Sequence, residues 1–192
     1  ILWTLLEHFL GDIFNPVTQS YSSLIQFLIT VVICQLTTNY LPCILYTKTK
    51  KINFTKLFRF NKITLKQFMH SFIIFIAFNG ISAFLLMIQD IILSNFGMKF
   101  EMNNYMIAEN LPALIILIIT AGILIPLGEE LFFRGLLIRG IEGIGKLFPI
   151  VVSAFYFAIN HSNPYRLITL FLFGLLFGLI MYYTNSLIPG II

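Results

Sequence analysis

Long apolar stretches separated by short polar segments set the pattern of this chain. About 20 consecutive apolar residues are enough for a helix to cross the hydrocarbon core of a membrane. The stretches predict spans at residues 22–46, 68–93, 111 to about 138, 148–161 and 167–183, and a sixth from 187 that is still unfinished at Ile192. We therefore predict an all-α fold, a polytopic transmembrane helix bundle of about six or more spans whose C-terminal span is truncated.

The first 14 residues are also apolar but contain Glu7, His8 and Asp12. This segment is predicted to be either the tail of an earlier span or an interfacial helix. Residue 1 is Ile rather than Met, so we expect the true N-terminus to lie upstream. No stretch is long and polar enough to fold separately in water, which predicts a single membrane domain over residues 1–192.

Composition supports membrane insertion. The chain is 58% hydrophobic and 10% charged, with a mean hydropathy of +0.92. A soluble domain carries roughly 25% charged residues, so this chain has too few charged residues to cover a water-facing globule. We predict an integral membrane protein with the lipid bilayer as its surroundings.

Basic residues are concentrated in one segment. Seven of the twelve Lys and Arg residues lie between Lys48 and Lys66, with no acid among them. Basic loops beside spans are typical of the cytoplasmic side. We therefore place loop 47–67 in the cytoplasm and the segment 94–110 outside. A basic run can also bind nucleic acid, but its position between two apolar spans argues against a nucleic-acid partner.

The aromatic residues in this loop allow two interpretations. Phe54, Phe58 and Phe60 interleave with Lys56 and Arg59. That pattern suits a helix lying in the headgroup region. An ordinary connecting loop with buried aromatic side chains fits it equally well.

The two cysteines show no sign of a metal or redox site. Cys34 and Cys43 are nine residues apart, without a Cys-x-x-Cys motif or a Cys or His partner nearby. We predict that both are small buried residues.

Three ionisable residues interrupt one of the most apolar stretches. Residues 111–127 carry no charge, yet Glu129, Glu130 and Arg134 follow directly. Each ionised group near the bilayer centre costs about 2.5–3.5 kcal/mol on insertion scales. Glu130 and Arg134, four apart with the acid first, are spaced for a salt bridge. Glu129, rotated by about 100° on a regular helix, has no basic residue four positions away, which suits a general base.

Pro126 and Gly128 precede the acids. Proline bends a helix, and membrane helices tolerate the bend where neighbours or water satisfy the freed groups. The sequence allows either a bend that opens a wet cavity beside Glu129 or a simple kink.

A second polar element, Phe157-Ala-Ile-Asn160-His161, ends a short apolar stretch before the helix-breaking Asn163-Pro164. A lone histidine on an apolar helix is usually a packing residue. Imidazole is nevertheless a common partner for a carboxylate in activating water or holding a metal. His8 and His70 do not lie in such a motif, and we predict no catalytic role for them.

Several reaction types lack their motifs. The chain has no His-Glu-x-x-His, no Gly-x-Ser-x-Gly, no P-loop and no dinucleotide fingerprint. A carboxylate and a histidine acting on water remain as the candidate chemistry.

The string Glu129-Glu130-x-x-x-Arg134, followed by Phe157-x-x-x-His161, resembles the CAAX protease and bacteriocin-processing family, also called the Abi family of intramembrane proteases. The segment Thr-Asn-Ser-Leu-Ile-Pro at 184–189 looks like the third motif of that family. The resemblance covers residues 111–192, the core of a protease domain that is incomplete at its C-terminus.

The resemblance implies an intramembrane endopeptidase in which Glu129 and His161 activate the attacking water. Glu130 completes the catalytic set, and Arg134 supports it; Phe157 and Asn160, which belong to the second motif, are further supporting candidates. A metal-free glutamate mechanism is the favoured view of that family, and zinc stays open as a cofactor; if a zinc ion is bound, Glu129 and His161 would hold it. The third motif of the family contributes a further histidine, which by spacing would follow Ile192. The predicted topology places Glu129 and His161 at different depths. For them to meet, either the helix ends must shift by a turn or two, or the helices must dip to a cavity in mid-membrane.

Two other functions stay open from the residues. One is a non-catalytic bacteriocin immunity factor or regulatory membrane protein of the same family. The other is an ion or proton transporter, which would predict acids spread over several helices rather than gathered on one.

The abundance of Ile, Phe, Asn and Lys is typical of an AT-rich bacterial genome. It favours a bacterial cell membrane as the location. In that setting the expected substrates are membrane-associated proteins or peptides, such as bacteriocin leaders, secreted signals or membrane-protein tails, rather than prenylated proteins.

Overall fold

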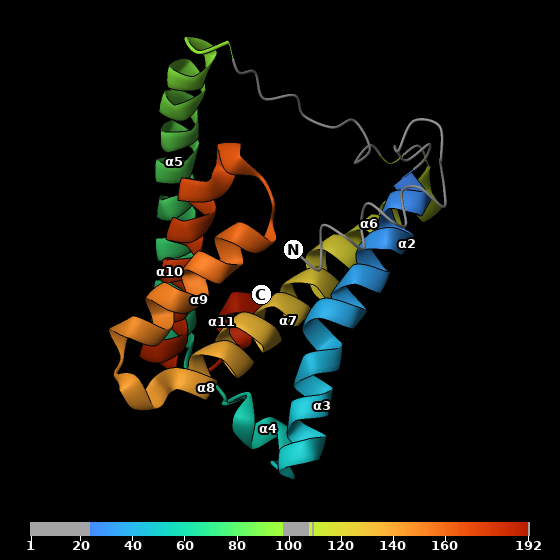
Figure 1. Cartoon of the computed structure of the whole chain (residues 1–192), viewed down its shortest axis with the longest axis vertical. Coiled ribbons are helices and arrows are strands. Elements are labelled where there is room, and N and C mark those ends of the chain that lie inside the picture. Colours follow the sequence, from blue (N-terminus) through green and yellow to red (C-terminus); the bar gives the residue numbers. More distant parts are fainter. Residues whose placement is uncertain (1–23, 98–107, 109, 192) are drawn as a thin grey trace. The chain divides into compact units, whose positions relative to one another are not determined.

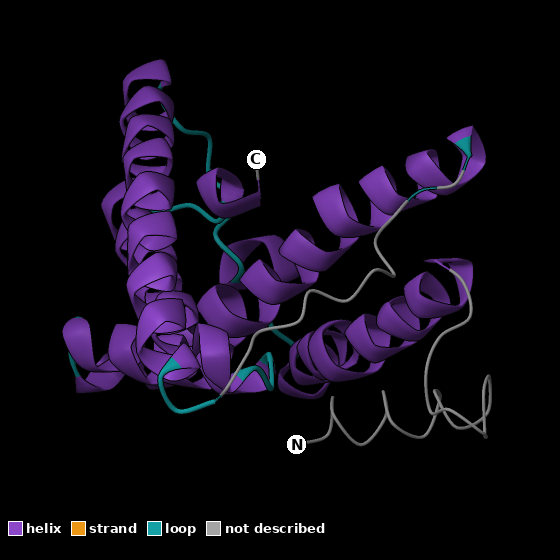
Figure 2. Cartoon of the chain, turned by 90° about the horizontal axis from the view of Figure 1, so that it is seen from above, coloured by secondary structure: helices purple, strands orange, loops and turns teal. Residues whose placement is uncertain are grey.

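The structure is a computed structural model that describes residues 24–97, 108 and 110–191. Every regular element in those ranges is a helix, which confirms the predicted all-α fold (Figure 2). The predicted N-terminal segment 1–14, the start of the first span at Ser22, the last residue Ile192 and most of segment 94–110 lie outside the described residues. The chain divides into two compact units, 1–52 with 102–132 and 53–101 with 133–192. Each unit is described by itself below.

The described residues contain four helices that are long and apolar enough to cross a membrane. They are Gln26–Lys50, Leu65–Ser94, Leu111–Ile144 and Pro164–Thr184. The fourth predicted span, 148–161, is the shorter apolar helix Leu147–Asn160, and the described part of the sixth contains the short helix Ile188–Ile191. Together these helices confirm a membrane protein built as a helical bundle.

In the first unit, the N-terminal helical run packs against a second run that leads to the paired acids. The first run comprises α2 (Leu24–Gln35), η1 (Leu36–Tyr40) and α3 (Leu41–Lys50), and the second comprises α6 (Leu111–Ile119), η3 (Thr120–Leu124) and α7 (Ile125–Glu129). Both η1 and η3 are π-helical, so their backbone hydrogen bonds reach five residues back instead of four. Asn110 caps the second run by accepting a hydrogen bond from the backbone N–H of Ala113 at 2.9 Å.

The buried face of the first run changes character along its length. At its start, Leu24 and Leu28 pack against Ala113 in an apolar cluster. About three turns later the same face carries Gln35 and Asn39, which are almost completely buried. Cys34 and Cys43 are buried on this run as well, as predicted. One part of the face therefore has an amide pair where a membrane helix would ordinarily have apolar side chains.

The second unit is built around α10. It contains α4 (Phe54–Leu57), α5 (Leu65–Ser94), α8 (Arg139–Ile141), η5 (Glu142–Ile144), α9 (Leu147–Asn160), η6 (Pro164–Arg166), α10 (Leu167–Thr184) and α11 (Ile188–Ile191). The π-helical η4 (Glu130–Ile138) begins in the first unit and continues into this one. Helix α10 packs against both α9 and α5 (Figure 1).

Helices α9 and α10 approach closely because glycine lines the contact. A Cβ atom added at Gly174 would lie 2.6 Å from Cα of Ala154, and one added at Gly178 would lie 2.7 Å from Cγ2 of Ile150. The Gly-x-x-x-Gly spacing is the small-residue pattern that lets membrane helices pack with their backbones close together. This contact fixes α9, which carries the second motif.

The basic loop is a connecting loop rather than a surface helix. Its only helix, α4, has four residues and is capped by Asn53, which accepts from the N–H of Lys56 at 3.2 Å. Leu57 and Phe58 are buried, and the Phe54 and Phe58 rings lie 4.4 Å apart. The structure therefore favours the second of the two interpretations of this segment.

Candidate active site

The helix that carries the first motif is not a regular α-helix. Glu129 is the last residue of α7, whereas Glu130 begins the π-helical η4. The regular α-helix that the sequence analysis assumed for Glu130 and Arg134 is therefore replaced by a π-helical stretch from Glu130 to Ile138. A physical reason lies in Pro126, whose missing N–H leaves the carbonyl four residues earlier without its α-helical donor. Wider turns on both sides let other backbone groups take over, and such turns are frequent at functional sites.

The two acids differ in burial. Glu130 is 3% exposed, whereas Glu129 is half-buried. Glu129 is thus the more accessible of the two acids, and the catalytic roles of both stay predictions. The predicted pairs Glu129–His161 and Glu130–Arg134 each join the two compact units, and both stay predictions.

A polar group that the sequence analysis missed lies beside the first motif, within the same unit. Tyr40 donates its hydroxyl to the carbonyl of Leu124 at 2.7 Å, and Nδ2 of Asn39 donates to Oε1 of Gln35. A Cβ atom at Gly128 would lie 2.7 Å from Cε2 of Tyr40 and 2.9 Å from Oε1 of Gln35. The available signal was the pair of amides, Gln35 and Asn39, four residues apart in an apolar span; neither is ionisable, so neither stands out as a candidate for acid–base chemistry.

Arg134 connects the first motif to the second. Its side chain is buried, with the guanidinium carbon 4.5 Å from the centre of the Phe157 ring and 5.3 Å from that of Phe177. Its Nη2 donates to the carbonyl of Gly174 at 3.4 Å. Cation–π contacts of desolvated arginine are worth about 2 kcal/mol or more. The structure thus brings together Arg134 and Phe157, two of the predicted supporting residues.

His161 follows the last residue of α9 and is oriented by its own helix. Its Nδ1 lies 2.8 Å from the carbonyl oxygen of Phe157, and the two rings meet edge to face with centroids 4.7 Å apart. A carbonyl only accepts, so Nδ1 carries the proton and the lone pair of the neutral ring is on Nε2. An imidazole in this tautomer is suited to orient a water or accept a proton. Asn160, the last residue of α9, is half-buried, and its role stays a prediction.

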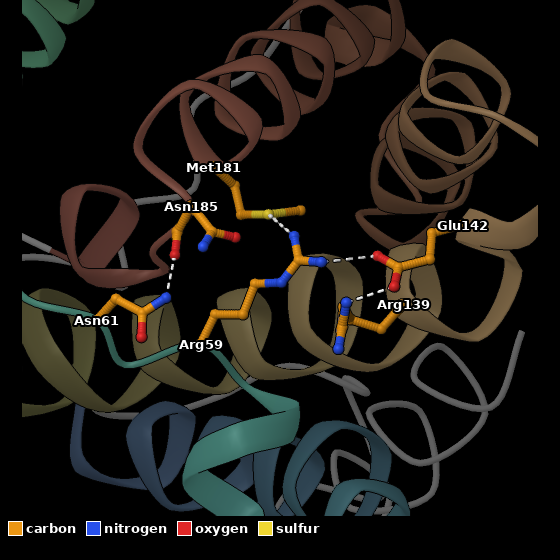
Figure 3. Close-up of polar contacts among 6 residues, drawn as sticks. All are labelled: Arg59, Asn61, Arg139, Glu142, Met181 and Asn185. Carbon is orange, nitrogen blue, oxygen red and sulfur yellow. Dashed lines mark hydrogen bonds and ion pairs between the residues drawn. The ribbon is translucent and has the colours of Figure 1, made fainter.

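The predicted third motif forms the turn between α10 and α11. Asn185 adopts a left-handed conformation with φ of 51° at the end of α10. Asn61 donates from Nδ2 to the carbonyl of Asn185 at 2.7 Å (Figure 3), and Ser186 donates from its hydroxyl to the carbonyl of Asn61 at 2.7 Å. The basic loop therefore holds the turn at which the last helix begins.

An ion-pair network anchors the same loop. Arg59 donates from Nη2 to Glu142 at 3.0 Å and from Nη1 to the sulfur of Met181 at 3.8 Å (Figure 3). The carboxylate of Glu142 also pairs with Arg139. One loop is thus tied both to η5, through Glu142, and to α10, through Met181.

A metal centre has weak support. A zinc site usually has three or four protein ligands. Across the described ranges, no three His, Cys, Asp or Glu side chains gather in a way that could hold a metal ion. These residues do not fit a zinc site, and no step proposed below passes through a metal.

Comparison with known protein families gives a match over the C-terminal part of the sequence. Residues 111–192 match the model of the family described as Rce1-like, type II CAAX prenyl endopeptidase. The match covers the segment on which the resemblance was based and confirms it. Neither the curated proteins nor the solved structures contain a match to this chain.

Proposed function

Because residues 111–192 match the Rce1-like family of type II CAAX prenyl endopeptidases, we propose that this membrane protein is a member of that family and an intramembrane endopeptidase. Membership of the family implies peptide-bond hydrolysis of membrane-associated substrates. The proposal adds the residues that perform it, with Glu129 as general base and His161 as the group that orients the water.

The proposed reaction begins with a water molecule between these two side chains. Glu129 accepts one proton of the water, while Nε2 of His161 accepts a hydrogen bond from the other. The resulting hydroxide adds to a backbone carbonyl carbon of the substrate. Glu129 then returns its proton to the leaving nitrogen as the C–N bond breaks. The observation that carries this proposal is the hydrogen bond from Nδ1 of His161 to Phe157, which leaves the lone pair on Nε2.

Arg134 and Glu130 are proposed to support the site without touching the reacting atoms. The guanidinium of Arg134 packs on the Phe157 ring, and Phe157 contacts His161 through both its ring and its carbonyl. Arg134 is therefore proposed as a positioning residue for the imidazole. Glu130, which is buried, is proposed to balance the charge of Arg134, and Asn160 is proposed to support His161.

We propose that the substrates are membrane-associated proteins or peptides of a bacterial cell, with bacteriocin leaders, secreted signals and membrane-protein tails ahead of prenylated proteins. The composition supports a bacterial origin, and the family supports a substrate that reaches the enzyme from the bilayer.

The test of this proposal compares membrane and secreted peptides from cells that carry the wild-type protein or Glu129→Ala. We expect uncut precursors to accumulate in the variant. A His70→Ala strain serves as the control, since His70 is an exposed histidine of α5. Identical peptide profiles in the Glu129→Ala and wild-type strains would argue against proteolysis. A host phenotype that survives both Glu129→Ala and His161→Ala would instead favour the immunity or regulatory role.

The sidedness of the basic loop gives a separate prediction. We propose that loop 47–67 is cytoplasmic, so a cysteine introduced at exposed Lys56 should resist a membrane-impermeant maleimide in intact cells and react after permeabilisation. A cysteine at Phe96, which is 72% exposed, should react in intact cells. Cys34 and Cys43 are about 1% exposed or less and should contribute little background. The opposite labelling pattern would reverse the proposed orientation.

A further inference from the structure

Gln35 is a buried amide packed against the residue that precedes Glu129. Its side chain is 2% exposed, and its Oε1 would lie 2.9 Å from a Cβ atom at Gly128. Consecutive Cα atoms are about 3.8 Å apart, so the amide lies one residue away from the proposed general base. Any side chain at position 128 would displace it, and glycine gives it the room to approach.

The hydrogen bonding of Gln35 differs from that of the other polar side chains in its helix. Thr30, Thr37, Thr38 and Thr47 each donate to a carbonyl four residues back in the same helix, so their burial is compensated locally. Gln35 instead accepts a hydrogen bond from Asn39 through Oε1. Within the part of the chain that the structure describes, its Nε2 donates to no protein atom. An amide N–H that donates to no protein atom is available to donate to a ligand.

The surrounding structure holds this donor in place. The π-helical turn Leu36–Tyr40 begins directly after Gln35, and it lets Asn39 reach back to the amide. Tyr40, in the same π-helical turn, holds this part of the helix against η3 by its hydrogen bond to the carbonyl of Leu124. The amide is thus oriented by its neighbours before any ligand arrives.

An extended peptide inside a membrane needs such a donor. Backbone carbonyls in an apolar interior must be hydrogen-bonded, and a peptide unwound for cleavage loses its internal partners. A protease working in the bilayer therefore has to supply N–H groups beside its catalytic base. Gln35 meets this requirement because its Nε2 carries two protons.

We propose that Gln35 is a substrate-positioning residue, with Nε2 donating a hydrogen bond to a backbone carbonyl of the peptide bound beside Glu129, and with Asn39 orienting the amide. This inference rests on the proposed function. It adds the helical run formed by α2, η1 and α3, which lies outside the matched family segment, to the substrate site.

The test measures binding in proteoliposomes, in a Glu129→Gln background that is expected to prevent turnover. Two fluorescent peptides serve as probes, one ending in S-farnesyl Cys-Val-Ile-Ser and the other carrying an unprenylated apolar segment. Gln35→Met keeps the length of the side chain but removes its donor, and Gln35→Glu keeps the shape with a carboxylate. Gln89→Met, on α5, is the matched control.

We expect both Gln35 variants to raise the Kd of each probe by up to about tenfold, the effect of one lost hydrogen bond. Gln89→Met should stay within about twofold of the parent, and the unfolding temperature of all variants should be similar. The effect should appear with both probes because both present a peptide backbone. Asn39→Leu should weaken binding less than Gln35→Met, since it disturbs the orientation of the donor but leaves the donor itself.

Unchanged Kd values in Gln35→Met and Gln35→Glu would overturn the inference, as would the absence of saturable binding of either probe to the parent. A loss of binding that follows a fall in unfolding temperature would assign Gln35 a purely structural role. In parallel, peptide hydrolysis is measured for the single variant Glu129→Ala, which carries no substitution at Gln35. If that variant cleaves while Gln35→Met binds poorly, the proposed catalytic base is wrong and the role of Gln35 stands.

Discussion

Replacing Glu129 with alanine is expected to lower the rate of peptide hydrolysis by about 10²- to 10⁴-fold, the usual contribution of a general base. The substitution removes a half-buried carboxylate at the end of α7, where alanine has a higher helix propensity. The fold should therefore persist, with unchanged extraction and unfolding behaviour. The measurement is the single-turnover cleavage rate of a fluorogenic membrane peptide in proteoliposomes.

The double variant Glu129→Ala/His161→Ala distinguishes a shared mechanism from two independent effects. Groups that act on one water molecule give strongly non-additive losses, so the double variant should be little worse than either single one. Glu142→Gln is the acid control, because Glu142 pairs with Arg59 and Arg139 in the ion-pair network rather than with the proposed water. Additive losses, or cleavage by Glu129→Ala at more than a tenth of the wild-type rate, would contradict the proposed roles.

The membrane helices could be predicted well because insertion into lipid depends on local composition. The predicted span 167–183 corresponds to α10 at Leu167–Thr184, and the predicted span 68–93 lies within α5 at Leu65–Ser94. The predicted and observed helix ends differ where a capping interaction determines the end. Helix α5 begins earlier because Thr64 and Gln67 form a capping box, which an apolar window does not detect.

The arrangement around the acids could not be predicted, because it depends on contacts between distant residues. Tyr40 reaches the carbonyl of Leu124 across 84 positions of sequence, and Gln35 packs on Gly128. The π-helical turns also escaped prediction, since the expected periodicity assumed a regular helix on both sides of Pro126. Ionisable residues indicate candidate chemistry from the sequence alone. The role of a neutral amide can be inferred only from the residues that it contacts in the folded protein.

The second motif was predicted from its residue types, but its geometry was not. The spacing of Phe157 and His161 places both on one face of a helix. Only the structure shows that the aromatic ring lies between the guanidinium of Arg134 and the imidazole. Phe177 of α10, on the other hand, carries no motif and adds a second ring contact to the same arginine.

Substituting Gly174 with alanine is expected to destabilise the second unit by about 2 kcal/mol, within the range for overpacking a core. A Cβ atom there would lie 2.6 Å from Cα and 2.8 Å from Cβ of Ala154. Backbone cannot rotate away as a flexible side chain does, so α9 and α10 must separate. Equilibrium unfolding in mixed micelles measures the change, with Gly80→Ala as the control because a Cβ atom at Gly80 would meet nothing within 4 Å.

The same substitution should reduce hydrolysis more than the loss of stability alone explains. The carbonyl of Gly174 accepts from Arg134, whose guanidinium packs on Phe157, so a displaced α10 disturbs the support of His161. Ala154→Gly in the Gly174→Ala background removes part of the overlap and should restore part of both stability and activity. If Gly174→Ala unfolds like the wild type, the close contact of α9 and α10 is not present in the membrane. If stability falls but the remaining folded protein cleaves at the wild-type rate, Arg134 has no positioning role.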